Sequence, residues 1–81
     1  MNNTEKIIEI IRREMGVFID SSAEITPDTN LIRDLHVDSL DLVAIVDTIE
    51  EEFGIKIRND DLTNIRTVND IDRKINELKA Q

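Results

Sequence analysis

One apolar helix face, with a typical helix start before it and a typical helix end after it, constrains the fold of this chain more than any other feature. In residues 39–53, large apolar side chains recur at the spacing that places them on one face of an α-helix: Leu42, Ile45, Val46, Ile49 and Phe53. Asp38 is a typical N-cap, Asp41 stands at the second position of a capping box, and Gly54 is a typical helix end. Because a helix with one apolar face has to bury that face, other elements must pack against it.

Two further segments show helical spacing. Residues 4–15 carry apolar side chains on one face, and Gly16 follows as a stop signal. Thr67, with Asp70 at the capping-box position, predicts the start of a last helix whose apolar residues recur over residues 68–78.

One short element fits between the second helix and the last. Asn59 can cap a short helical turn through Leu62, whereas residues 55–57 alternate like a strand but have no partner strand, so we expect an extended connector there. The predicted fold class is all-α: a small antiparallel four-helix bundle with a short third helix and a long loop between helices one and two.

The long loop, residues 17–37, contains apolar residues that are too regular for a disordered linker: Val17, Phe18, Ile25, Leu31, Ile32, Leu35 and Val37. A loop of this length in a small domain normally packs or carries function. We therefore expect it to pack across the bundle, with a short turn of helix near residues 31–35. Eighty-one residues provide for one core, which predicts a single domain over residues 1–81.

Composition excludes several classes of function. The net charge is −8, and residues 34–61 hold nine acids against two bases, which together with two Phe and no Tyr or Trp argues against nucleic-acid binding. The chain has no cysteine, and its acids do not match the spacing of a calcium loop, so we expect no dedicated metal site. No stretch resembles a signal peptide or a membrane span, which predicts a cytoplasmic protein without a membrane partner.

Ser39 is the candidate for chemistry. Its hydroxyl lies at the predicted N-terminus of the helix over residues 39–53, between two carboxylates. A nucleophilic serine needs a base and a group that orients the base, but the only histidine is His36, and no G-x-S-x-G elbow surrounds the serine. Two interpretations remain: an ordinary first-turn serine, and a serine that other proteins modify. We predict no catalytic residue and no enzymatic activity.

The solvent-facing side of the same helix carries a mixed stripe. Leu40, Ala44, Asp47 and Glu51 lie opposite the apolar face. An ordinary solvated face would show such a pattern. The functional alternative is docking to basic surfaces of partner proteins, because charge accelerates their encounter.

The strings LIRDLHVDSLDLVAIVDTIEEEFGIKI and TVNDI make residues 3–79 resemble the acyl carrier proteins, which carry phosphopantetheine in fatty-acid and polyketide synthesis. The resemblance implies that a phosphopantetheinyl transferase attaches 4′-phosphopantetheine from coenzyme A to Ser39. Acyl groups would be held as thioesters on this arm and delivered to enzymes of fatty-acid, polyketide or a specialised acyl pathway. The family usually has a small Gly-Ala or Gly-x pair before DSL, where this chain has His36 and Val37.

The resemblance also implies two sets of residues. Partner docking would use Asp38, Leu40, Asp41, Glu50 and Glu51, to which the exposed stripe adds Asp47. An acyl chain sheltered between the second and third helices would contact Val43, Val46, Ile49, Ile57, Leu62 and Ile65, and ordinary core packing is the alternative for these six. The partners would be the transferase and acyl-transferring or synthase enzymes with basic docking surfaces, and we expect a monomer. The alternative function is an unmodified acidic helical interaction module, with or without a response to calcium.

Overall fold

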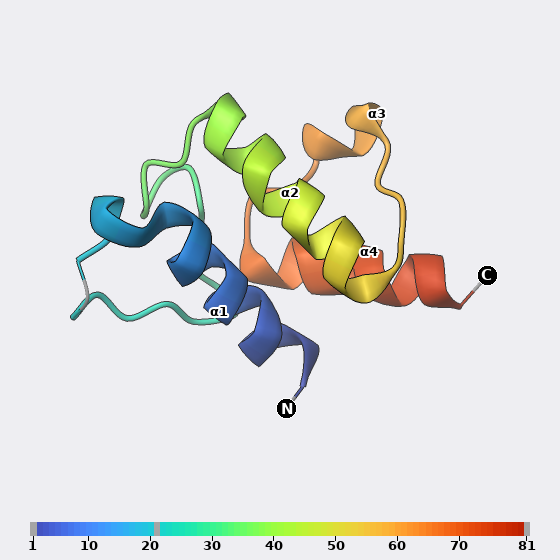
Figure 1. Ribbon diagram of the computed structural model, residues 1–81, viewed down its shortest axis with the longest axis horizontal. Helices are drawn as coiled ribbons and strands as arrows, with labels where there is room; N and C mark the ends of the chain where they lie inside the picture. The colour runs from blue at the N-terminus through green and yellow to red at the C-terminus, as the bar shows by residue number, and fades with distance from the viewer. Residues whose placement is uncertain (1, 21, 81) are drawn as a thin grey trace.

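The computed structural model describes residues 2–20 and 22–80. It contains α1 (Asn3–Met15), the 3₁₀ turn η1 (Gly16–Phe18), α2 (Ser39–Phe53), the short α3 (Asn59–Leu62) and α4 (Val68–Lys79), as Figure 1 shows. The predicted all-α bundle with a short third helix and a long first loop is confirmed. None of the helices in these two ranges is long and apolar enough to cross a membrane.

The predicted helix ends are largely confirmed. At the start of α2, Asp41 N–H donates to the Asp38 side chain, and the Asp41 side chain accepts from Asp38 N–H. Thr67 and Asp70 form the same reciprocal pair at the start of α4. The prediction for Asn59 is wrong: it is the first residue of α3, and Arg58 takes the N-cap position with an extended backbone and no side-chain capping bond.

The core lies where α1 packs against both α2 and α4. Its most deeply buried side chains are mainly isoleucines at helical spacing, with exposed fractions of 0–1%: Ile7, Ile10, Ile11, Leu31, Ile45, Ile49, Val68, Ile71 and Ile75. Because each of these three helices contributes one apolar face, burial of those faces provides the main stabilisation of the bundle.

Backbone hydrogen bonds join the long loop to the start of α4. Leu31 N–H donates to the carbonyl of Arg66 over 2.7 Å, and Asn69 N–H donates to the carbonyl of Pro27 over 2.9 Å. Asn30 and Thr67 form an isolated antiparallel bridge. These bonds hold the loop against the bundle, as the apolar content of the loop predicted.

Parts of the loop differ from the prediction. Ile25, Leu31 and Val37 are buried, but Phe18 is 77% exposed and Ile32 is 45% exposed, so these two side chains do not pack into the core. The short turn of helix predicted near residues 31–35 is present as hydrogen-bonded turns: Asp34 N–H donates to the Asn30 carbonyl over 2.8 Å and closes one helical turn, which is not continued.

Candidate functional site

Ser39 is the first residue of α2, and its side chain is exposed. Asp38 precedes it in an extended conformation, and Asp38 Oδ1 accepts the N–H of Asp41 over 2.9 Å. This capping box fixes the direction in which the first turn of α2 begins. The serine hydroxyl therefore lies on a rigid element at a surface that another protein can reach.

The first turn of α2 offers hydrogen-bond donors beside the hydroxyl. Leu42 N–H donates to the Asp38 carbonyl and Asp41 N–H to the Asp38 side chain, whereas the N–H groups of Ser39 and Leu40 have no partner among the described residues. Free N–H groups at a helix N-terminus favour a nearby anion. A phosphodiester on Ser39 fits these donors, although the carboxylates of Asp38 and Asp41 oppose its charge.

Two hollows follow the boundary between α2 and α3, starting at Ser39. The first has a volume of about 410 Å³ and is lined by Ile32, Ser39, Leu42, Val43, Leu62, Thr63, Ile65 and Arg66. The second has a volume of about 260 Å³ and is lined by Val43, Val46, Asp47, Glu50, Lys56, Ile57, Arg58, Asn59 and Leu62. Both include Val43 and Leu62, so the two hollows are neighbours, and we refer to the pair as the α2–α3 groove.

The residues predicted for an acyl pocket occupy different places relative to this groove. Val46, Ile57 and Ile65 line it from buried positions, Leu62 is half-buried, and Val43 is 42% exposed at its surface. Ile49 is fully buried in the core and lines neither hollow.

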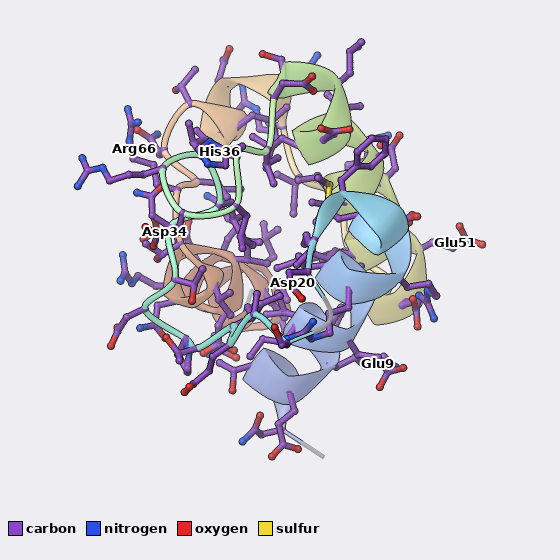
Figure 2. All side chains as sticks on the ribbon, turned by 90° about the vertical axis from the view of Figure 1, so that its left-hand side faces the viewer. Glu9, Asp20, Asp34, His36, Glu51 and Arg66 are labelled. Atoms are coloured by element: carbon purple, nitrogen blue, oxygen red, sulfur yellow. The ribbon has the colours of Figure 1, made fainter. Side chains whose placement is uncertain are left out.

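The predicted docking residues are partly exposed and partly half-buried. Leu40 is 81% exposed, Asp38 is exposed at the N-cap, and Asp47 and Glu51 are exposed farther along α2, with Glu51 pointing away from the body of the molecule in Figure 2. Asp41 is half-buried and belongs to the capping box.

Glu50 has an internal partner. Its Oε2 accepts the N–H of Ile57 over 2.6 Å, so this half-buried carboxylate ties the connector after α2 back to the helix. Sequence reasoning missed this role, and the acid-rich string around Glu50 holds no signal that distinguishes it from its neighbours.

Two other findings bear on chemistry. His36 is exposed and has a φ of 59°, in the left-handed region that side chains rarely adopt. Within residues 2–20 and 22–80, no group of three or more His, Cys, Asp or Glu side chains is placed to hold a metal ion.

Comparisons with known proteins identify the family. The family model for the phosphopantetheine attachment site matches residues 5–73. The acyl carrier protein of Solidesulfovibrio magneticus is 38% identical over 81 residues, covering all of both chains. That of Syntrophobacter fumaroxidans is 44% identical over 66 residues, covering 82% of this chain and 78% of the relative. A solved structure described as a candidate acyl carrier protein of Mycobacterium tuberculosis superposes with a TM-score of 0.75 at 34% identity, covering 86% of this chain and 89% of that one.

Acyl carrier proteins are not catalysts: they are modified by a phosphopantetheinyl transferase and deliver their cargo to synthase and transferase enzymes. The family match over residues 5–73, the relative that aligns over the whole of both chains and the similar solved structure agree on one family, whose fold this chain shares. This chain therefore belongs to the acyl carrier protein family and is a carrier that holds acyl groups on a covalently attached 4′-phosphopantetheine.

Proposed function

We propose that Ser39 is the residue that carries the 4′-phosphopantetheine. Support comes from its exposed hydroxyl at the start of α2, from the free N–H groups beside it and from the α2–α3 groove that begins there. The chain encodes no cysteine, so the thiol that holds acyl groups as thioesters has to come from the arm. The single observation that carries the proposal is the opening of an apolar groove directly beside an exposed helix-terminal hydroxyl.

The attachment reaction needs no catalytic residue from this chain. A bond forms between Ser39 Oγ and the phosphorus of coenzyme A that bears the pantetheine. The bond from that phosphorus to the adenosine bisphosphate breaks, and the hydroxyl proton passes to the transferase. The role of this chain is to present the hydroxyl on a fixed helix end, where the transferase can position it.

The α2–α3 groove is the proposed shelter for the acyl chain. Its wall is largely apolar at the end near Ser39, where Leu42, Val43 and Ile65 contribute, so burial of a chain there removes apolar surface from water. Farther along, Glu50 ties the connector that carries Ile57 to α2 and so holds one side of the groove. A longer chain would extend past Val43 and Leu62, which both hollows share.

The proposed docking surface is the exposed face of α2 around Leu40, Asp47 and Glu51, which would contact basic surfaces of partner enzymes. The three side chains are exposed, and the acids concentrate the negative charge on this helix. Such a surface increases association rates with basic partners, most strongly at low salt. A monomer and a cytoplasmic location remain predictions.

Intact mass spectrometry tests the attachment residue. After incubation with coenzyme A and a broad-specificity phosphopantetheinyl transferase, we expect the wild type to gain one phosphopantetheine and Ser39→Ala to gain none. Ser22→Ala is the matched control, because Ser22 is another exposed serine and should leave the mass gain unchanged. A gain on Ser39→Ala, or none on wild type with a transferase active on another carrier, would exclude Ser39.

Stopped-flow association with a partner enzyme tests the docking surface. Asp47→Lys should slow association about three- to tenfold at low salt and much less at high salt, because the encounter depends on charge. Glu9→Lys makes the same charge change at an exposed position on α1 and serves as the control. Equal rates for the two variants would remove Asp47 from the interface.

A further inference from the structure

One basic residue shares a hollow with Ser39. Of the residues that the structure describes, Arg66 is the only charged one that lines the hollow of about 410 Å³ to which Ser39 contributes. A smaller adjoining hollow at Ser39 has one charged lining residue, Asp38, which carries the opposite sign. Among the described residues, the surroundings of the proposed attachment point therefore include one positive side chain at the entrance of the α2–α3 groove.

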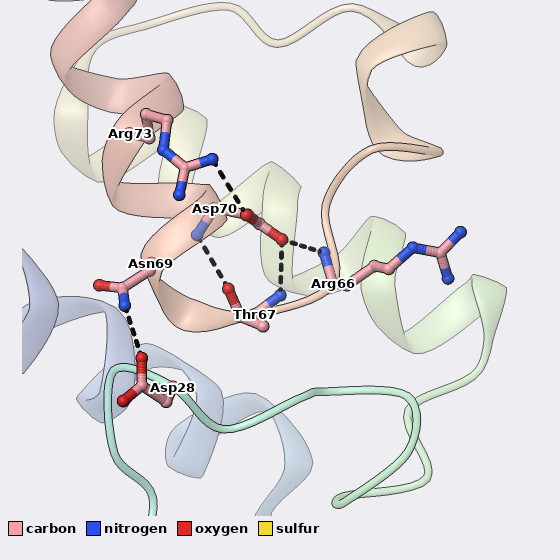
Figure 3. Close-up of polar contacts among 6 residues, drawn as sticks. All are labelled: Asp28, Arg66, Thr67, Asn69, Asp70 and Arg73. Atoms are coloured by element: carbon pink, nitrogen blue, oxygen red, sulfur yellow. Dashed lines mark hydrogen bonds and ion pairs between the residues drawn. The ribbon is translucent and has the colours of Figure 1, made fainter.

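The backbone of Arg66 is held on both sides. Its N–H donates to Asp70 Oδ2 over 2.9 Å, and its carbonyl accepts the N–H of Leu31 over 2.7 Å. Asp70 is itself fixed, because the same oxygen accepts the N–H of Thr67 over 3.0 Å and the other oxygen lies 3.4 Å from Arg73 Nη1 (Figure 3). The position from which the Arg66 side chain extends is thus set by the start of α4 and by the long loop.

The guanidinium of Arg66 is not used by the fold. In residues 2–20 and 22–80 it forms no hydrogen bond or ion pair, which also holds for the guanidinium of Arg33, whereas Arg13, Arg58 and Arg73 each pair with a carboxylate. Figure 3 shows the side chain extending away from Asp70 and Thr67. The anchored backbone fixes where this side chain starts, and its unpaired guanidinium is available to an anion within its reach.

The charge at Ser39 indicates which anion this is. Asp38 and Asp41 already lie beside the hydroxyl, so a phosphodiester attached there adds a third negative charge in a small region. The two nearby carboxylates raise the free energy of the attached phosphodiester. An arginine offsets that effect, because its planar guanidinium can bind two phosphate oxygens at once.

We propose that Arg66 is a positioning residue for the phosphodiester of the prosthetic group. Its guanidinium pairs with the free phosphate oxygens and directs the first atoms of the arm toward the α2–α3 groove instead of across the exposed face of α2. This inference rests on the proposed attachment at Ser39, and it adds a contact across the groove from the segment that precedes α4.

The first test observes Arg66 directly. The side-chain Nε–H signals of Arg66 and Arg33 are compared by NMR in apo protein and in holo protein that intact mass shows to carry one arm without cargo. At low salt we expect the Arg66 signal to shift on modification and to return toward its apo position in 0.5 M NaCl, while the Arg33 signal stays in place. Arg33 is the matched control, an exposed arginine of the long loop that lines neither hollow at Ser39.

The second test measures the consequence for the fold. The change in melting temperature between apo and holo protein at low salt should be about 2–4 °C less favourable in Arg66→Gln than in wild type, and the same as wild type in Arg33→Gln. An unmoved Arg66 signal, or an equal holo-minus-apo change in wild type and Arg66→Gln, overturns the inference while the attachment at Ser39 stands. Failure of the wild type to gain the arm would overturn both.

Discussion

Replacing His36 with glycine should stabilise the fold, because this residue has a φ of 59°. The left-handed region brings the Cβ of an ordinary residue close to its own backbone, whereas glycine adopts it without that clash. His36 is exposed, so little packing is lost with its side chain. The position is also one at which acyl carrier proteins usually have a small residue, and this chain departs from that pattern.

The magnitude follows from two opposing effects. A Cβ in the left-handed region costs about 1–2 kcal/mol, with histidine near the low end because it tolerates this region better than most residues. Against this, glycine lowers the free energy of unfolding by about 0.4–1 kcal/mol, because it increases the conformational entropy of the unfolded chain. The net gain for His36→Gly is about 0.5 kcal/mol, which corresponds to an increase in melting temperature of about 2–4 °C in a domain of this size.

Thermal unfolding followed by circular dichroism measures this effect, with His36→Ala as the matched control. Alanine removes the imidazole but keeps the Cβ, so its melting temperature should not exceed that of the wild type. The glycine variant should therefore be the most stable of the three. If alanine and glycine melted at the same temperature, the backbone conformation of His36 would not be strained and the reasoning would fail.

Three further outcomes are expected. Glu50→Ala should lower the free energy of unfolding by about 1–2 kcal/mol and speed amide exchange at Ile57, because the bond from Ile57 N–H to the carboxylate is lost. Glu51→Ala removes an exposed carboxylate and serves as the control, so it should change the free energy of unfolding by less than about 0.5 kcal/mol. Partial burial would raise the pKa of Asp70, but the N–H groups of Arg66 and Thr67 outweigh it and hold that pKa below its usual 3.8. The stability difference between wild type and Asp70→Asn in urea titrations should thus be constant above about pH 5 and shrink as the pH falls through the lowered folded-state pKa. Raising NaCl from about 10 mM to 0.5 M should increase the melting temperature, because the net charge of −8 opposes folding, and an unchanged temperature would contradict this.

Local sequence signals predicted the helices well. The pairs Asp38–Asp41 and Thr67–Asp70 form the capping boxes that their spacing indicated, and Gly54 ends α2 in the left-handed conformation. These features depend on residues within one helical turn of each other, so the sequence contains the relevant information.

The features that sequence reasoning missed depend on contacts between distant segments or on backbone angles. Glu50 is one of three consecutive glutamates, and only the return of the connector brings Ile57 N–H to its carboxylate. Arg66 lines the same hollow as Ser39, and its backbone is held there through bonds to Asp70 and the long loop. Phe18 shows the converse: its apolar character predicted burial, but the tight turn after α1 leaves it 77% exposed.

The short length and shallow burial of α3 have a consequence for how carriers of this kind diversify. None of the four residues of α3, all of them described by the structure, is fully buried, whereas α1 joins α2 and α4 through the core. Substitutions in α3 can therefore alter the width of the groove without weakening the elements on which folding depends. If cargo lies in this groove, as proposed above, natural selection can explore new cargo sizes along a nearly neutral path, with the stability of the bundle and the affinity for cargo inherited as separate traits.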